Sequence, residues 1–171
     1  MILKDGGESH PVSTLEPVIR PLRPEDLDEL AELWRALAVE GAPGGLVLYP
    51  PTDENVARWC RWVADAVRKG EIQVLVAKAG GHIVGYVLFG ERRSPLESPY
   101  RRGVIHDLYV RPGWRRRGLG TRLLEEALAR LRATGVDLVT ISVATTNRAA
   151  LALYRKLGFE DFLLTLVKRL R

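Results

Sequence analysis

Apolar residues recur along the chain with two periods, and these periods predict its secondary structure. Spacings of three and four residues place apolar side chains on one face of a helix, whereas alternation places them on one face of a strand. The helical period predicts helices over about 24–38, 53–69, 118–133 and 148–157. Alternating or β-branched runs predict strands over about 17–21, 72–79, 83–90, 104–110, 136–143 and 162–170.

The order of these segments indicates the fold class. Helices are mixed with hairpins, such as the one expected at Gly80-Gly81, so we predict an α+β (mixed α/β) fold with a mixed, mostly antiparallel sheet. Strand 104–110, helix 118–133 and the following strand should form one right-handed parallel crossover. Residues 1–16 are polar and without periodicity, and we interpret them as a loosely ordered extension. Residues 17–171 are expected to form a single domain.

The composition excludes several kinds of protein. A chain of 171 residues with 46% hydrophobic and 27% charged residues is typical of one globular domain. The single cysteine, Cys60, excludes an intramolecular disulfide, and the three histidines lack the spacing of common zinc motifs. No apolar run reaches the roughly 20 residues that span a bilayer, and the first residues lack a signal-peptide core. We therefore expect a cytoplasmic protein without a metal or a membrane partner.

Positive charge gathers at one turn. The net charge is +5, and seven arginines lie between Arg111 and Arg132 against two glutamates. Part of this cluster, Arg115-Arg116-Arg117-Gly118-Leu119-Gly120-Thr121, lies between a predicted strand and a predicted helix. Glycines let a ligand approach the backbone, the free N–H groups at a helix start favour an anion, and arginines add charge. The pattern therefore predicts a pyrophosphate site.

The sequence also argues against a P-loop, a Rossmann dinucleotide site and a nucleic-acid-binding surface. A P-loop requires GxxxxGK[ST], which is absent, and Leu123 stands where a Rossmann fingerprint requires its third glycine. A nucleic-acid-binding protein would spread arginines and aromatic residues over a broad surface. Here the arginines are concentrated at one turn, so nucleic acid is not an expected partner.

Two motifs resemble those of the GNAT family of N-acetyltransferases. The string from Asp107 to Gly120, DLYVRPGWRRRGLG, resembles the family signature, whose core is [R/Q]-x-x-G-x-[G/A]. The string Asn147-x-x-Ala150-x-x-x-Tyr154-x-x-x-Gly158-Phe159 resembles the second motif. The element order of 17–170 also agrees with the family's fold. The resemblance implies a sheet of about six or seven strands flanked by four helices, splayed open at the strand that binds coenzyme A (CoA).

The resemblance also implies roles for the matched residues. Main-chain N–H groups of the arginine turn would hold the pyrophosphate of acetyl-CoA, the cosubstrate, and the 108–110 backbone would pair with its pantetheine arm. Asn147 would contact the pantetheine, and Tyr154 would protonate the leaving thiolate. Asn147 and Tyr154 are seven residues apart, which is two helical turns, so both would point the same way. The expected cofactor-binding residues are Leu108, Tyr109, Val110, Arg115, Arg116, Arg117, Gly118, Leu119, Gly120, Thr121 and Asn147.

The general base is left open by the sequence. Strict alternation would place Ile105, Asp107 and Tyr109 on one face of their strand and His106 and Leu108 on the other. Some relatives carry a glutamate at the position of His106 or two residues before it, and this chain has neither. His106 could serve as a catalytic base, because imidazole is basic near neutral pH, or the amine could lose its proton to water. Asp107 is interpreted as structural, for example as the partner in an ion pair.

The leading functional hypothesis is transfer of an acetyl group from acetyl-CoA to a primary amine of a small molecule or peptide by direct attack. The alternative is a non-catalytic sensor or regulatory module that binds CoA. Tyr154 argues against the alternative, since a sensor needs no proton donor at the sulfur. The sequence carries no recognisable motif for the acceptor amine. An acceptor with a carboxylate or phosphate would suit the basic residues Arg92, Arg93, Arg101 and Arg102. Whether the chain forms a homodimer is left open by the sequence.

Overall fold

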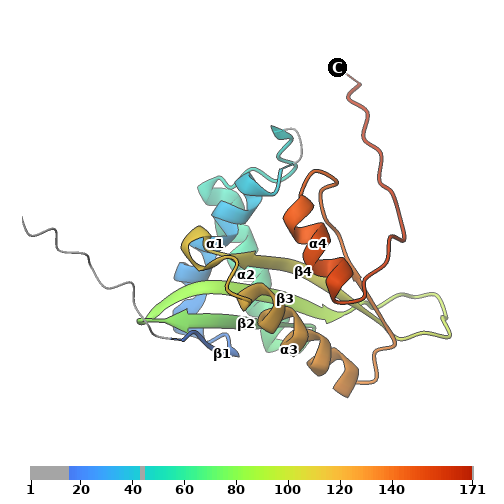
Figure 1. The fold of residues 1–171 in the computed structure, drawn as a ribbon, viewed down its shortest axis with the longest axis horizontal. Helices are drawn as coiled ribbons and strands as arrows, with labels where there is room; N and C mark the ends of the chain where they lie inside the picture. The colour runs from blue at the N-terminus through green and yellow to red at the C-terminus, as the bar shows by residue number, and fades with distance from the viewer. Residues whose placement is uncertain (1–15, 43–44, 171) are drawn as a thin grey trace, which may run out of the picture.

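The computed structural model describes residues 16–42 and 45–170. Within them, a five-stranded sheet has the order β1-β2-β3-β4-β5, and helices lie on both of its faces (Figure 1). The strands are β1 (Val18–Pro21), β2 (Ile72–Ala79), β3 (His82–Glu91), β4 (Arg102–Val110) and β5 (Leu138–Ile141). The α-helices are α1 (Leu27–Glu40), α2 (Asp53–Arg68), α3 (Leu119–Ala133) and α4 (Arg148–Lys156), with 3-10 turns η1 (Pro24–Asp26) and η3 (Pro112–Trp114). The predicted mixed fold class is confirmed.

Local sequence explains where several elements begin and end. The helix predicted from Pro24 begins with the separate turn η1, and α1 follows directly. At the start of α2, the Thr52 hydroxyl accepts a hydrogen bond from the Asn55 N–H at 3.2 Å, as an N-cap residue does. The β2–β3 hairpin turns at Gly80 and Gly81, whose φ angles of 57° and 84° suit glycine. Of the extension predicted over 1–16, all but Glu16 lies outside the described residues.

Two apolar cores hold the helices against the sheet. On one face, Leu30 and Leu33 of α1 and Val63 of α2 pack against strand residues that include Tyr86. On the other face, residues of α3 and α4 pack against the alternate side chains of the same strands. The central strands are therefore buried on both faces, which accounts for their nearly continuous apolar sequences. The α3 and α4 residues of the second core are Leu119, Leu123, Leu124, Ala127, Leu131 and Tyr154.

The sheet opens between β4 and β5. Strands β1 to β4 are antiparallel, whereas β4 and β5 are parallel and are connected through α3, which confirms the predicted parallel pairing. The β4–β5 ladder covers only Arg102–Ile105 against Leu138–Ile141. The rest of β4, residues 106–110, pairs with β3 alone. The sheet is therefore splayed at the strand for which the resemblance implied it.

The expected final strand is not formed. Residues 160–170 have no regular secondary structure (Figure 1). Their large apolar side chains are exposed. The alternation of this segment is compatible with a strand, but a strand also needs a hydrogen-bonded neighbour, and among the described residues this segment is paired with none. The described sheet consequently has five strands rather than the six or seven expected.

Candidate functional site

The predicted pyrophosphate turn joins β4 and η3 to α3. Arg116 has a φ of 60°, the one positive value among the described non-glycine residues, and Gly118 has a φ of 76°. The Arg122 N–H donates to the Gly118 carbonyl at 3.0 Å and closes the first turn of α3. In the described part of the chain, no protein acceptor is found for the N–H groups of 116–121. Left-handed residues in such a turn direct successive N–H groups to one side and create a concavity for an anion.

The two glycines of the turn differ in backbone conformation and in surroundings. Gly118 requires its left-handed conformation, and a Cβ added there would meet no atom within 4 Å. A Cβ on Gly120 would lie 3.4 Å from Leu153 Cδ2 and 3.9 Å from Val110 Cγ2. Both are ordinary van der Waals distances, so the packing of α3 against α4 and β4 does not by itself require glycine at this position. The room for a ligand predicted at Gly120 stays a prediction.

The three arginines of the turn are not equivalent. The Arg115 Nε donates to the Val110 carbonyl at 2.7 Å, and its Nη2 pairs with Glu40 Oε2 at 2.5 Å. Arg115 therefore ties the turn to the end of α1. Arg117 stacks over the Trp114 ring at 5.4 Å, and neither it nor Arg116 forms an ion pair with the residues that the structure describes. Arg116 and Arg117 remain available to an anion.

The half of β4 without a β5 neighbour presents backbone groups to the opening. The Arg111 N–H donates to the Val84 carbonyl at 2.9 Å, so the N–H and C=O of Val110 point away from β3. The alternation of an antiparallel ladder gives Leu108 the same orientation. The Val110 carbonyl is used by Arg115, which leaves both N–H groups and the Leu108 carbonyl facing the splayed side. These are the groups expected to meet a pantetheine arm.

A β-bulge at His106 changes which β4 side chains share a face. Leu88 is opposite Asp107 and Phe89 is opposite Ile105, so His106 is the extra residue. Ile105 and Leu108 consequently lie together in the core under α3, and Tyr109 lies in the core under α1 and α2. The prediction of strict alternation, which placed Ile105 with Tyr109, is wrong because the bulge intervenes.

His106 and Asp107 are candidate bases on the α1–α2 side of β4. The His106 ring meets Trp62 of α2 edge-on, with centroids 6.0 Å apart. Partial desolvation and the charge of Arg92 lower the pKa of His106. Burial raises the pKa of Asp107 to about 6, although the Tyr86 hydroxyl, 3.3 Å from Asp107 Oδ2, opposes this shift. The ion pair suggested for Asp107 is not found among the described residues, and its partner is this tyrosine.

Tyr154 of α4 lies on the other side of β4. Its side chain is 8% exposed and packs against Phe159, and burial raises its pKa to about 12. The hydroxyl has no hydrogen-bond partner among the described residues. No fully enclosed side-chain polar atom among them lacks a partner, so the hydroxyl reaches an opening. A neutral phenol that faces an opening can donate a proton or a hydrogen bond to a ligand.

Asn147 lies just outside α4 as its N-cap. Its Oδ1 accepts from the Ala150 N–H at 3.1 Å, which leaves the side-chain NH₂ as a donor. Because Asn147 has a ψ of 76°, the seven-residue helical spacing to Tyr154 does not set its direction. Its first role is to begin the helix that carries Tyr154.

Glu40 joins both parts of the site, and sequence reasoning did not single it out. The Tyr109 hydroxyl donates to Glu40 Oε1 at 2.7 Å, and Arg115 pairs with the second oxygen. Burial opposes ionisation of Glu40, but the bonds from Arg115 and Tyr109 outweigh it and lower the pKa. Glu40 therefore holds the end of α1 against both β4 and the turn. No local pattern indicates this role, since Arg115 is 75 residues away along the chain.

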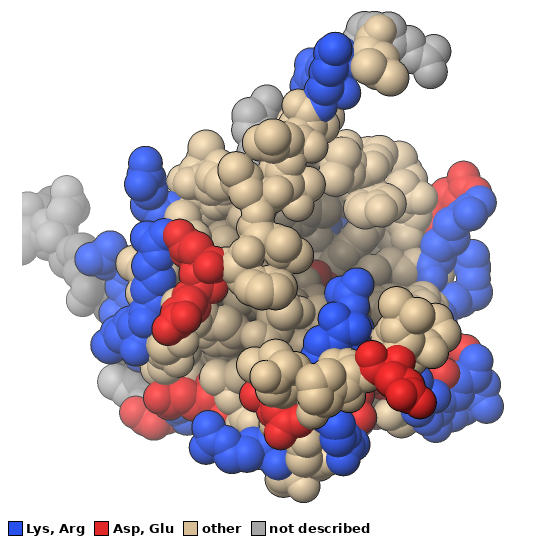
Figure 2. Space-filling model, turned by 90° about the vertical axis from the view of Figure 1, so that its right-hand side faces the viewer, with Lys and Arg blue, Asp and Glu red and all other residues tan. Residues whose placement is uncertain are grey.

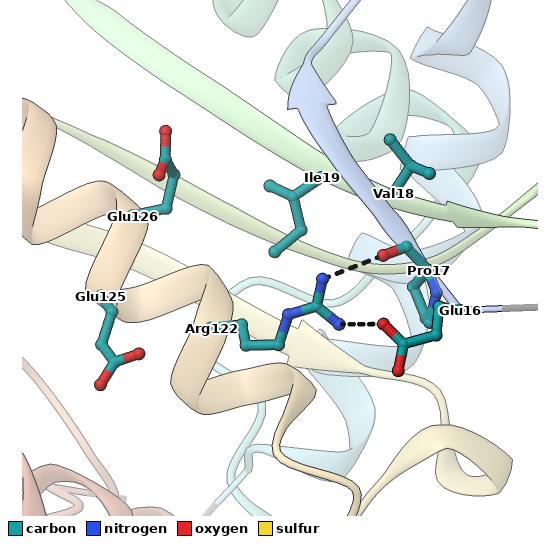
Figure 3. Close-up of a pocket in the computed structure, with 7 residues that line it drawn as sticks. All are labelled: Glu16, Pro17, Val18, Ile19, Arg122, Glu125 and Glu126. Atoms are coloured by element: carbon teal, nitrogen blue, oxygen red, sulfur yellow. Dashed lines mark hydrogen bonds and ion pairs between the residues drawn. The ribbon is translucent and has the colours of Figure 1, made fainter.

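One face of the molecule is hollowed. Figure 2 shows this hollow among mostly uncharged residues, with Lys and Arg both beside it and toward the edges of the face, where Asp and Glu lie among them. A separate open groove of about 640 Å³ lies between α3 and the start of β1 (Figure 3). There the Arg122 guanidinium donates to the Pro17 carbonyl at 3.2 Å. None of the predicted site residues lines that groove, so it is distinct from the site.

Metal-ligating clusters and membrane-spanning helices are both absent from the described residues. Within residues 16–42 and 45–170, no group of three or more His, Cys, Asp or Glu side chains is arranged to hold a metal ion. Among the helices described, none has the length and apolarity required to cross a bilayer.

Comparisons with known proteins agree with the geometry. L-methionine sulfoximine/L-methionine sulfone acetyltransferase of Pseudomonas aeruginosa is 33% identical over 113 residues, 66% of this chain and 64% of that protein. The alignment thus spans just under two thirds of that relative. Ribosomal-protein-alanine N-acetyltransferase of Brucella melitensis, a solved structure, is 28% identical with a TM-score of 0.68 over 84% of each chain.

A further solved structure shares the fold at low identity. A protein of Clostridium acetobutylicum, described as a predicted acetyltransferase with acetyl-CoA, has a TM-score of 0.74 at 17% identity, over 90% of this chain and 96% of that one. The model of the acetyltransferase (GNAT) family matches residues 27–159, which include the turn, the splayed strand and Tyr154. This chain belongs to the GNAT acetyltransferase family.

Proposed function

We propose that this protein transfers the acetyl group of acetyl-CoA to a primary amine of a small molecule or peptide. Acetyl-CoA supplies the acetyl group as a thioester, in which the amine nitrogen replaces the sulfur at the carbonyl carbon, and the thiol leaves with a proton. The observation that carries the proposal is the adjacency of an anion-binding turn and an unpaired half-strand. A diphosphate linked to an extended amide arm fits both features at once.

The cofactor side of the proposal rests on backbone groups. The N–H groups of 116–121 and the side chains of Arg116 and Arg117 would hold the pyrophosphate. Leu108 and Val110 would pair with the pantetheine amides, and one of their N–H groups would stabilise negative charge on the thioester oxygen. Arg115 is assigned to holding the turn in place, because Glu40 and the Val110 carbonyl occupy its guanidinium.

The proton donor and the base would lie on opposite sides of β4. Tyr154 would donate to the departing sulfur, since its raised pKa keeps the hydroxyl protonated. His106 and Asp107 both lie on the α1–α2 side, and each titrates low enough to be unprotonated near neutral pH. Separation of donor and base by one strand suits a reaction in which nitrogen approaches the carbonyl from one side and sulfur departs on the other.

The acceptor class can be narrowed by charge and by the named relatives. Arg92 lies near enough to His106 to lower its pKa, and Arg101 is already bound to Glu91 at 2.9 Å. A cation beside a candidate base would suit an acceptor with a carboxylate next to its amine. The Pseudomonas aeruginosa relative acts on L-methionine sulfoximine and L-methionine sulfone, and a 35% identical Escherichia coli relative is an L-amino acid N-acyltransferase. We therefore propose amino acids and their analogues as the first acceptors to test.

The experiment measures release of CoA thiol from acetyl-CoA with a panel of amino acids, polyamines, aminoglycosides and peptides. Acetyl transfer predicts thiol release that depends on one amine class, with one acetylated product per thiol detected by mass spectrometry. Tight acetyl-CoA binding without amine-dependent thiol release across the panel would refute the enzyme assignment and favour the sensor alternative. Absence of acetyl-CoA binding would refute both.

A further inference from the structure

Asp107 places a carboxylate in the largely apolar strand β4, where one tyrosine holds it. The Tyr86 hydroxyl donates to Asp107 Oδ2 at 3.3 Å. Tyr86 is fully buried in the core under α1 and α2, and Asp107 is the one hydrogen-bond partner of its hydroxyl among the described residues. Removing a carboxylate from water without an ion pair is costly, and groups perturbed in this way cluster at functional sites. The Tyr86–Asp107 pair is therefore a candidate for a role in the reaction.

The β-bulge at His106 directs Asp107 towards this tyrosine. Without the extra residue, alternation would place Asp107 with Ile105 on the side of α3. With it, Asp107 lies on the α1–α2 side, as Tyr86 and Tyr109 do. Bulges commonly re-aim a side chain beside an active site. Here the bulge brings a carboxylate to the side of β4 from which the acceptor amine is expected to approach.

The second carboxylate oxygen of Asp107 is open to a ligand. Oδ1 has no hydrogen-bond partner among the described residues, and no fully enclosed side-chain polar atom among them lacks one. Oδ1 therefore reaches an opening while the Tyr86 hydroxyl fixes the other oxygen. The ring of His106 is held less firmly, since it meets Trp62 edge-on and neither ring nitrogen has a hydrogen-bond partner among the described residues. A general base needs a fixed accepting atom, which favours Asp107 over His106.

We propose that Tyr86 is a positioning residue that holds Asp107 as the general base of the reaction. The proposal rests on the acetyl transfer inferred above. Asp107 Oδ1 takes one proton from the acceptor's ammonium group and passes it to solvent, which leaves the nitrogen with the electron pair that attacks the thioester carbonyl. A second proton leaves the nitrogen as the amide forms, and one goes from Tyr154 to the departing sulfur, so a single proton is released overall. Tyr86 keeps its own proton, because burial raises its pKa well above the usual range.

The surroundings of Asp107 leave this hydrogen bond in control of its titration. Burial raises the pKa of Asp107 to about 6 and the bond from Tyr86 opposes the shift, with no contribution from a charged side chain of the described residues. The neighbouring Trp62 of α2 does not titrate. The other titratable or charged groups around this part of β4 are His106, Tyr109, Arg92 of β3, and Glu40 of α1 with its partner Arg115.

The test compares kcat/KM of Tyr86→Phe and the unmodified chain across pH on an identified acceptor. Loss of the hydrogen bond should raise the pKa of Asp107 by about one unit, which is the scale of a bond to a charged group. The rate of the variant relative to the unmodified chain should then fall about 5-fold at pH 6 and by no more than about 20% at pH 8. This ratio cancels the titration of the acceptor amine, whereas a merely structural role of Tyr86 would lower both rates alike.

Two further variants control the comparison. Tyr100→Phe makes the same chemical change at an exposed position and should reproduce the unmodified pH profile. Added to Asp107→Asn, Tyr86→Phe should cause no further pH-dependent loss, because its effect passes through the carboxylate. Circular dichroism melts and acetyl-CoA affinities verify that each variant folds.

Carbon-13 NMR of the aspartate carboxyls reads the same titration without an acceptor, with Asp107 assigned from the Asp107→Asn spectrum. In the unmodified chain this carboxyl should titrate near pH 6, and in Tyr86→Phe about one unit higher. An Asp107 carboxyl that titrates near the ordinary value of about 3.9, or an acidic limb of kcat/KM that Tyr86→Phe does not move, would overturn the proposal. Absence of amine-dependent thiol release from the unmodified chain is the separate result that refutes acetyl transfer and, with it, a base of any identity.

Discussion

The replacement Tyr154→Phe isolates the hydroxyl of the proposed proton donor. The ring is buried against Phe159, and the hydroxyl has no partner among the described residues, so removal breaks no hydrogen bond and should change the free energy of unfolding by no more than about 1 kcal/mol. Acetyl-CoA affinity should also be retained, because the ring and the turn are unchanged. The effect is expected in turnover alone.

The size of the expected fall in kcat follows from the raised pKa of Tyr154. A phenol with a pKa of about 12 is a weaker acid than a thiol of about 8.5, so complete proton transfer in the resting site is uphill. The hydroxyl would therefore act mainly as a hydrogen-bond donor to charge that develops on sulfur, which contributes about 1.5–3 kcal/mol. This corresponds to a fall in kcat of roughly 10- to 150-fold, at or below the lower end of the roughly 10²–10⁴-fold range for general acids.

The assay compares kcat and the acetyl-CoA dissociation constant of Tyr154→Phe with those of Tyr100→Phe. Tyr100 is 54% exposed and provides the same chemical change at a surface position. The Tyr100 variant should match the unmodified protein in both measurements. A Tyr154 variant with undiminished kcat on an identified acceptor would refute the assignment of the proton donor.

Three further predictions concern the turn, the base and the stability of the fold. Gly118→Val forces a branched residue into a φ of 76° and should weaken acetyl-CoA binding at least 10-fold, measured by calorimetry. The control Gly113→Val, at an uncrowded position, should keep its affinity. Equal affinities of the two variants would contradict the role of the turn. If Asp107 is the base, activity falls as pH drops through about 6 because the carboxylate becomes protonated. Asp107→Asn should then remove that acidic limb while His106→Gln retains it, and the reverse result assigns the base to His106. Asp26→Asn should reduce the free energy of unfolding by about 3 kcal/mol in urea melts at pH 7, since the buried carboxylate holds Arg20 at 2.6 Å and Lys78 at 3.1 Å. The pKa of Asp26 lies well below its usual range, so this stabilisation persists above roughly pH 4 and is lost as pH falls further; a difference unchanged at pH 2 would contradict the reasoning.

Elements with a strong local period could be predicted from the sequence. The spacing of Leu119, Leu123, Leu124 and Leu131 sets one face of α3 whatever lies opposite, and all four are buried. The hairpin at Gly80-Gly81 is likewise a local property of two residues that accept positive φ.

Features that depend on distant neighbours could not be predicted in the same way. The bulge at His106 is set by the register between β3 and β4, and alternation within β4 carries no record of it. The burial of Asp107 had a weak signal, an acidic residue inside an apolar strand, but its partner Tyr86 lies on another strand. Residues 162–170 have the period of a strand, yet a strand also requires an edge to join.

The double contact of Glu40 ties events at the end of α1 to events at the arginine turn. One carboxylate holds both the Tyr109 hydroxyl and the Arg115 guanidinium, so a displacement of α1 alters the support of the turn. Suppose that bound acetyl-CoA stabilises the turn and α1, and that the acceptor contacts α1. Acetyl-CoA would then raise the affinity for the acceptor, and thermodynamic linkage requires the acceptor to raise the affinity for acetyl-CoA by the same factor. The cooperativity between the two substrates would then be a property of a single ion pair at the end of α1.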